Sequence, residues 1–146
     1  MSNKTYIHYG NKTFDINKFE KIQNEWSKPI GGLWASPVDT DCGWKDWCKS
    51  EDFRECDEEN SFKFKLKEGS KVLLVNKLSD VDQYITQDSI YCSMCQNLNF
   101  EKMIDDGYDA IELIHGDNYR ELHFSLFNSW DCDSICIFNP KIMEFV

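Results

Sequence analysis

The spacing of the seven cysteines bears most directly on possible chemistry. Cys92 and Cys95 have the spacing of half a zinc site, but no second pair with that spacing is present, so we expect no metal. Cys132 and Cys136, four residues apart on a predicted strand, are not a usual ligand pair. A nucleophilic cysteine needs a histidine base and a lowered pKa, and the sequence indicates neither. Buried, unreactive thiols are therefore expected at Cys42, Cys48 and Cys56.

The three histidines differ in how they could serve a binding site. His8 lies near the end of a strand predicted over residues 4–9, and the turn residue Gly10 that follows places it near the mouth of a loop. His115 begins a predicted surface turn and His123 falls on an amphipathic segment, so neither is a leading candidate for a site. The sequence contains no Gly-x-Ser-x-Gly, Gly-x-x-x-x-Gly-Lys or Gly-x-Gly-x-x-Gly motif, which disfavours hydrolases and kinases.

Length and charge limit the possible partners. The chain has 146 residues, a net charge of −10 at pH 7 and a pI near 4.7, and it shows no cluster of basic residues. This charge repels long nucleic acids but leaves a small dinucleotide such as NAD possible. No secretory signal and no apolar run of about 20 residues is present. We expect one domain over residues 1–146, cytoplasmic, with reduced cysteines and no membrane partner.

Apolar patterning predicts short strands along the chain. In Phe62–Leu66 apolar residues alternate strictly with lysines, whereas the continuous apolar run Val72–Val75 predicts a strand buried on both faces. Pro37 is expected to end a strand that begins at Leu33. The other predicted strands are Lys4–Tyr9, Tyr108–Ile114, Ser134–Phe138 and Ile142–Val146.

A few short helices are predicted between the strands. Thr40 or Asp41 is expected to cap a helix that places Trp44, Trp47 and Cys48 on one buried face. The segments 14–22 and 120–128 fit more than one conformation. Because strands and helices do not alternate strictly, the fold class is α+β. The remaining predicted helices run from Ser79 to Ile85 and, capped by Asn99 and ended by Gly107, from Phe100 to Asp106.

Three separated segments carry a family resemblance that covers nearly the whole chain. They are Tyr6–Gly10, Gly31–Pro37, and Tyr108–Glu112 followed by Ser134–Pro140. In order and spacing they resemble the conserved segments of ADP-ribosyltransferases of the His-Tyr-Glu type, as in poly-ADP-ribose polymerases and diphtheria-like toxins. The chain is also similar to small proteins of bacteria and their phages that share Gly-Gly-Leu-Trp-Ala-Ser-Pro. The resemblance implies a compact, split antiparallel or mixed sheet with a few short helices.

The resemblance also implies a binding site for NAD. His8 would hold the adenosine ribose, and the backbone at Tyr9 and Gly10 would bind the nicotinamide amide. Trp34 would stack on the nicotinamide ring, an arrangement favoured by about 1 kcal/mol or more once desolvated, and Ser36 would supply a hydroxyl.

The sequence departs from this family at the catalytic glutamate. The family position falls on Ser134, next to Asp133, and Glu112 in the preceding strand is the other candidate acid. Because strand residues alternate, Asp133 and Ser134 should face opposite sides, so Asp133 could replace the glutamate only if a bulge re-aims it.

The expected function is therefore that of an NAD-dependent mono-ADP-ribosyltransferase, with NAD as substrate and a protein as a possible acceptor. The resemblance also suggests a protein encoded by a phage or mobile element that acts in host-phage conflict. One alternative is a catalytically weak module that binds or sequesters an NAD-like nucleotide. Another is an acidic protein that inhibits a partner by binding it.

Overall fold

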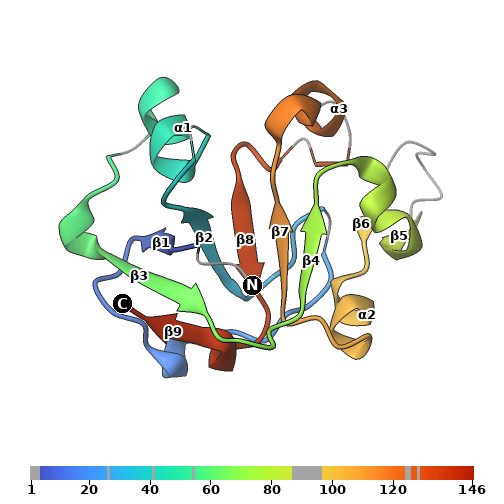
Figure 1. Ribbon diagram of the computed structural model, residues 1–146, viewed down its shortest axis with the longest axis horizontal. Helices are drawn as coiled ribbons and strands as arrows, with labels where there is room; N and C mark the ends of the chain where they lie inside the picture. The colour runs from blue at the N-terminus through green and yellow to red at the C-terminus, as the bar shows by residue number, and fades with distance from the viewer. Residues whose placement is uncertain are drawn as a thin grey trace.

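A curled, mixed sheet of seven strands forms the centre of the molecule, in the order β4-β7-β8-β2-β1-β3-β9 (Figure 1). This computed structural model describes residues 4–25, 27–40, 42–53, 55–86, 97–123, 126–127 and 129–146. Among the described strands, β4 and β7 pair in parallel and the other neighbours are antiparallel. The strands are β1 (Tyr6–Tyr9), β2 (Leu33–Pro37), β3 (Ser61–Leu66), β4 (Val72–Val75), β7 (Ala110–Leu113), β8 (Ser134–Ile137) and β9 (Met143–Phe145).

Short helices and one small hairpin complete the fold, which is α+β as the sequence predicted. In the described part of the chain no helix has the length and apolar character needed to cross a membrane. The α-helices are α1 (Trp44–Ser50), α2 (Phe100–Asp105) and α3 (Tyr119–His123), and β5 (Ile85–Thr86) pairs with β6 (Asn97–Leu98). Single 3-10 turns cover Ile16–Lys18, Glu58–Asn60, Gly116–Asn118 and Pro140–Ile142, and a longer 3-10 segment covers Leu78–Tyr84.

Two hydrophobic clusters pack against opposite faces of the sheet. In β7, Ile111 and Leu113 join the cluster that α2, α3 and the 3-10 segment at 78–84 cover. Ala110 of the same strand belongs to the second cluster. The curl of the sheet brings Tyr6 and Phe64 into this cluster as well. Because both faces are covered, all four residues of β7 and all four of β8 are buried.

Several local predictions are confirmed. All the predicted strands are present, and the segment after Asn99 is helical: the Asn99 side chain accepts from the Lys102 N–H at 3.0 Å, and Gly107 ends the turn with a φ of +96°. The undecided segment 120–128 begins as helix, in α3. The undecided segment 14–22 contains one 3-10 turn.

Three predictions about burial and capping are wrong. Val72–Val75 is not buried on both faces, because β4 is an edge strand and the Leu74 side chain is 54% exposed. Helix α1 begins after Gly43 rather than at Thr40, and Asp41 lies outside the described residues. Its aromatic face is only half-buried, since Trp44 and Trp47 stack on each other at 5.2 Å near the surface.

The Gly31-Gly32 pair determines how the chain enters β2. Both glycines have positive φ angles, +84° and +77°. A Cβ on Gly31 would lie 2.5 Å from the Lys21 carbonyl oxygen, and a Cβ on Gly32 would lie 2.9 Å from the Cys136 Sγ. The pair therefore allows a backbone conformation and a close approach that other residues do not permit.

Candidate functional site

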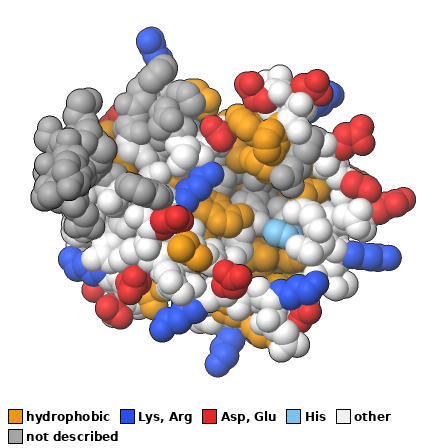
Figure 2. Space-filling view, turned by 180° about the vertical axis from the view of Figure 1, so that it is seen from behind, with side chains coloured by type: hydrophobic (Ala, Val, Ile, Leu, Met, Phe, Trp, Pro, Cys, Tyr) orange, Lys and Arg blue, Asp and Glu red, His pale blue; other side chains and the backbone are white. Residues whose placement is uncertain are grey.

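A cavity of about 300 Å³ opens beside β1, β2 and β8, on the sheet face that carries the first hydrophobic cluster. The strand register places Ile7 opposite Ser36 and Trp34 opposite Cys136, so alternate residues of β1, β2 and β8 face this side together. Trp44 of α1 and Trp130 add to the walls. The face of the molecule in Figure 2 shows hydrophobic side chains gathered at its centre beside a histidine, with lysine and acidic side chains around them.

Five of the six residues expected at a nucleotide line this one cavity. They come from three separate segments of the chain, namely His8 and Tyr9, Trp34 and Ser36, and Ser134. Gly10, the sixth, does not line it. Its φ is +117° and its N–H donates to the Asn60 carbonyl at 2.7 Å, which ties the end of β1 to the start of β3.

His8 is half-buried where β1 and β2 stop pairing. The Nδ1 atom lies 2.6 Å from the Trp34 carbonyl oxygen and the Nε2 atom lies 3.1 Å from Asn11 Nδ2. A carbonyl only accepts, so Nδ1 carries the proton and Nε2 accepts from the amide. Burial lowers the pKa of His8 in spite of the bond to the carbonyl, which favours the neutral ring.

Trp34 lines the cavity and also packs on the core. Its ring meets Trp130 edge-on at 4.9 Å and an angle of 70°, and Lys28 Nζ lies 5.5 Å from its centroid. Trp130 is held by its indole N–H, which donates to the Ser27 carbonyl at 2.8 Å. The buried Trp130 thus fixes the Trp34 indole, and the exposed Lys28 side chain covers part of the Trp34 ring.

Hydroxyl and thiol groups line another part of the cavity. Ser36 Oγ accepts from the Trp44 N–H at 3.0 Å, and Ser134 Oγ donates to the Cys132 carbonyl at 2.9 Å. Burial raises the pKa of the Cys132 thiol to about 11, even though Ser134 and Ser36 hydrogen-bond to it. A thiol with so high a pKa is a poor nucleophile at neutral pH.

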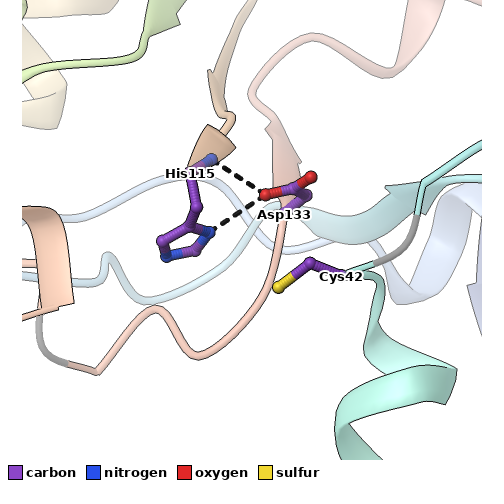
Figure 3. Close-up of side chains that lie close together, drawn as sticks. All are labelled: Cys42, His115 and Asp133. Atoms are coloured by element: carbon purple, nitrogen blue, oxygen red, sulfur yellow. Dashed lines mark hydrogen bonds and ion pairs between the residues drawn. The ribbon is translucent and has the colours of Figure 1, made fainter. Parts of the chain in front are cut away.

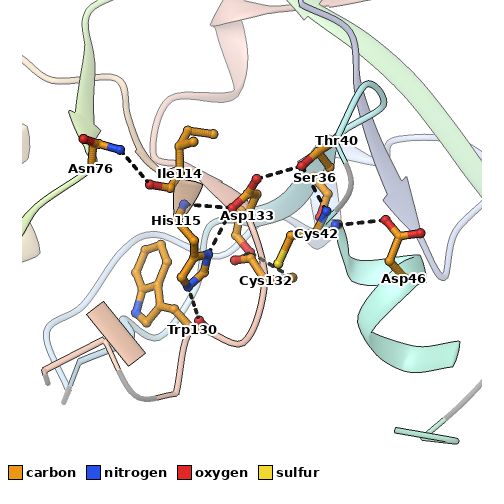
Figure 4. Close-up of polar contacts among 12 residues, drawn as sticks. Ser36, Thr40, Cys42, Asp46, Asn76, Ile114, His115, Trp130, Cys132 and Asp133 are labelled. Atoms are coloured by element: carbon orange, nitrogen blue, oxygen red, sulfur yellow. Dashed lines mark hydrogen bonds and ion pairs between the residues drawn. The ribbon is translucent and has the colours of Figure 1, made fainter. Parts of the chain in front are cut away.

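Asp133 is not among the residues that line the cavity, and its carboxylate is bound by other groups (Figure 4). Oδ2 accepts from Thr40 Oγ1 at 2.7 Å, and Oδ1 accepts from the backbone N–H of His115 at 2.9 Å. Burial alone would raise the pKa of Asp133, but the hydrogen bonds from His115 and Thr40 outweigh it and hold the pKa below its ordinary value.

His115 is not on a surface turn, contrary to the sequence prediction. Its side chain is 1% exposed, with Nδ1 3.0 Å from Asp133 Oδ1 and Nε2 3.0 Å from the Trp130 carbonyl. Gly116 and Asp117, which follow it, are exposed, but His115 itself lies two residues after the buried end of β7. The apolar strand before it was the signal for burial.

Glu112 lies on the other face of the sheet, among the second cluster. Its carboxylate accepts from Tyr6 Oη at 2.8 Å and from Lys4 Nζ at 3.0 Å. Burial, together with the negative charge of Glu112, raises the pKa of Tyr6. Neither Glu112 nor Asp133 is among the residues that line the cavity.

Asp131 is the carboxylate that sequence reasoning missed. Among the described lining residues it is the one acid, and Lys28 is the one lysine. Asp131 precedes β8, where no strand pattern assigns it a face. The available signal was its position in the sequence, two residues before Asp133. Cys132 and Ser134, on either side of Asp133, also line the cavity.

The structure describes five of the seven cysteines. The five described cysteines are free thiols, and Cys48 is buried as expected, whereas Cys42 and Cys56 are half-buried. Burial and the charge of Asp133 raise the pKa of Cys42. Cys92 and Cys95, which carried the zinc-pair argument, lie outside the described residues.

A second cavity of about 420 Å³ adjoins the first at His8, which lines both. Its lining is more polar and includes Asn11, Lys12 and Lys18. The backbone of Gly32 and the ring of Phe62 form other parts of it, and the Phe62 ring lies 5.0 Å from that of His8.

The chain matches no protein-family model, no curated protein and no solved structure. The fold and the site thus define an α+β domain with an aromatic-lined cavity beside its central strands.

Proposed function

We propose that this protein binds NAD, or a nucleotide of the same chemistry, in the cavity beside β1, β2 and β8, and transfers ADP-ribose from it. The observation that carries the proposal is that His8, Trp34 and Ser134, from three segments far apart in the sequence, line one cavity. Each segment was assigned to a nucleotide site from its sequence. Their meeting in space is independent support.

The chemistry of the cavity suits the nicotinamide end of the molecule. A volume of about 300 Å³ is at the lower limit for ligand pockets, enough for a nicotinamide ring with its ribose. The cationic ring would stack on Trp34 after displacing the exposed Lys28, and the Lys28 ammonium would then be free to approach the pyrophosphate.

The adjoining cavity suits the other half of the dinucleotide. Lys12 and Lys18 supply positive charge for phosphate oxygens, which the net charge of −10 would otherwise repel. His8 stands between the two cavities, where a neutral imidazole can bond to ribose hydroxyls once Asn11 moves aside.

Transfer requires negative charge near the nicotinamide ribose. As the glycosidic bond breaks, its electron pair goes to the nicotinamide nitrogen and positive charge develops on the ribose, before an acceptor attacks the same carbon and loses its proton. We assign Asp131 to stabilise this charge. It lines the cavity, whereas the carboxylates of Asp133 and Glu112 are bound elsewhere.

A second function, binding of the nucleotide without turnover, is favoured by a different observation. By the resemblance in sequence, Ser134 falls at the position of the family's glutamate, and its hydroxyl donates to the Cys132 carbonyl. A neutral hydroxyl does not supply the electrostatic stabilisation that a carboxylate gives, and a loss of a few kcal/mol slows the reaction by orders of magnitude. Sequestration of an NAD-like nucleotide needs the cavity but no acid.

Calorimetric titration with NAD and with nicotinamide alone tests binding of the nucleotide, which both proposed functions require. We expect NAD to bind wild-type protein and His8→Ala or Trp34→Phe to bind it at least several-fold more weakly. Trp47→Phe is the matched control, because Trp47 is a half-buried tryptophan that does not line the cavity. Absence of binding at millimolar NAD, or equal weakening in the Trp47 variant, contradicts the proposal.

A further inference from the structure

Three potential metal ligands from separate segments meet beside the cavity wall, outside the proposed nucleotide site (Figure 3). They are Cys42 in the loop between β2 and α1, His115 two residues after β7, and Asp133 directly before β8. One ligand atom from each lies within 4.8 Å of the others, and the His115 and Asp133 side chains are 1% and 8% exposed.

The contacts of His115 leave a position between its Nδ1 atom and Asp133 that a cation could occupy. Nε2 faces the Trp130 carbonyl at 3.0 Å, and because a carbonyl only accepts, Nε2 must carry a proton. In a neutral ring Nδ1 is then a lone pair, yet it faces a carboxylate oxygen at 3.0 Å. Two acceptors at this distance repel unless a proton or a metal ion lies between them.

The contacts of His115 are those of a metal-binding histidine. Such histidines usually donate the second ring N–H to a backbone carbonyl or carboxylate, which fixes the ring and leaves the other nitrogen for the metal. The Trp130 carbonyl does this for Nε2, so Nδ1 is the free ligand atom.

The two other ligands are also held in place. Thr40 Oγ1 donates to Asp133 Oδ2 at 2.7 Å, and the same hydroxyl accepts from the Cys42 N–H at 3.2 Å. The Asp133 N–H donates to the Cys42 carbonyl at 2.7 Å. Thr40 and the backbone thus fix Cys42 and Asp133 relative to one another before any ion binds.

We propose that Cys42 Sγ, His115 Nδ1 and an Asp133 carboxylate oxygen bind a divalent zinc-like cation. Thiolate, imidazole and carboxylate are the ligand types that Zn²⁺ takes in proteins. Tetrahedral zinc places nitrogen and oxygen ligands about 3.3–3.4 Å apart, a few tenths of an ångström more than the 3.0 Å seen here. Three protein ligands leave a fourth position for water or another donor.

A metal here would fasten three segments around the cavity wall. It would connect the end of β7, the start of β8 and the loop that leads into α1, which carries Trp44. The cysteine spacing predicted no metal, because the pair Cys92 and Cys95 has no second pair to complete a zinc site. This proposal does not depend on NAD binding.

Metal binding can be measured directly with cobalt as a probe for zinc. The full chain, reduced and freed of metal by a chelator, is titrated with Co²⁺ while its absorption is recorded. We expect one equivalent to bind with the charge-transfer band of a thiolate ligand and the visible bands of a four-coordinate ion. Zn²⁺ should then displace the cobalt and abolish both signals, with one zinc per chain by elemental analysis.

Cysteine variants locate the site. Cys42→Ser should lose the thiolate band and weaken Co²⁺ binding by more than about 100-fold, the upper end of what loss of an outer partner costs. Cys56→Ser, another half-buried cysteine, is the matched control and should bind like wild type. Cys92→Ser with Cys95→Ser should also bind normally. Circular dichroism confirms that each variant is folded.

Three outcomes overturn the proposal. The first is failure of the folded wild-type chain to bind Co²⁺ or Zn²⁺ at micromolar concentration. The second is a thiolate band that persists in Cys42→Ser. The third is loss of the band in the Cys92 and Cys95 variant, which would place the metal on that pair instead.

Discussion

Asp133 Oδ1 contacts the same residue twice: it accepts from the backbone N–H of His115 at 2.9 Å and lies 3.0 Å from the Nδ1 atom of the His115 ring. The carboxylate thus joins the end of β7 to the start of β8 while Cys132 and Ser134 on either side of it face the cavity. The position of Asp133 in the sequence suggested an acid for catalysis, and its contacts support a role in holding the cavity wall.

Replacement of Asp133 should cost stability. In Asp133→Asn the buried His115 ring loses its charged partner, and breaking a buried pair in this way costs roughly 3–5 kcal/mol of unfolding free energy. Urea unfolding measures the difference. Asp131→Asn is the matched control, since Asp131 is half-buried, and it should change stability by less than about 1 kcal/mol. Equal stability of the two variants would contradict the buried pair.

Replacement of Asp131 should instead cost turnover. If Asp131 stabilises the charge that develops on the ribose, Asp131→Asn should lower nicotinamide release from NAD by roughly 100-fold or more and leave NAD affinity nearly unchanged. Glu112→Gln, whose carboxylate lies on the other face of the sheet, should release nicotinamide at a rate close to that of wild type. If wild type releases none, binding without turnover is the better description.

Stability should depend on pH through His8. Burial lowers its pKa below the ordinary value of about 6.5, so between the two values the unfolded chain binds more protons than the folded one. Stability therefore rises with pH in this window and falls as pH drops below about 6.5. Urea unfolding from about pH 5 to pH 8 should show a shallower slope in His8→Gln than in wild type. Parallel curves would show that His8 does not titrate in this way.

Substitution by alanine should destabilise the protein far more at Gly31 than at Gly69, although the two glycines have nearly the same φ, +84° and +85°. Alanine at Gly69 meets nothing within 4 Å and should cost about 1–2 kcal/mol through its conformation alone. Alanine at Gly31 would also press on the Lys21 and Glu20 carbonyls, which adds roughly 1–3 kcal/mol. Thermal or urea unfolding of both variants compares them directly. Equal losses would mean that the close approach to these carbonyls is not limiting.

Sequence patterns were sufficient for most of the elements and for one detail of the site. Alternation predicted that Ser134 and Asp133 would face opposite sides, and in the structure Ser134 lines the cavity whereas Asp133 does not. Asn99 and Gly107 correctly marked the ends of α2. These features depend on the backbone geometry of a few consecutive residues, which local sequence controls.

The tertiary structure decided which side chains meet. Leu74 is exposed because β4 has one neighbour, His115 is buried because the Trp130 segment and Asp133 close over it, and Asp131 reaches the cavity from outside any strand. Each outcome depends on strand order and on contacts between residues far apart in the chain. Periodicity reports which residues share a face, but the elements that cover that face are determined only when the whole sheet has assembled.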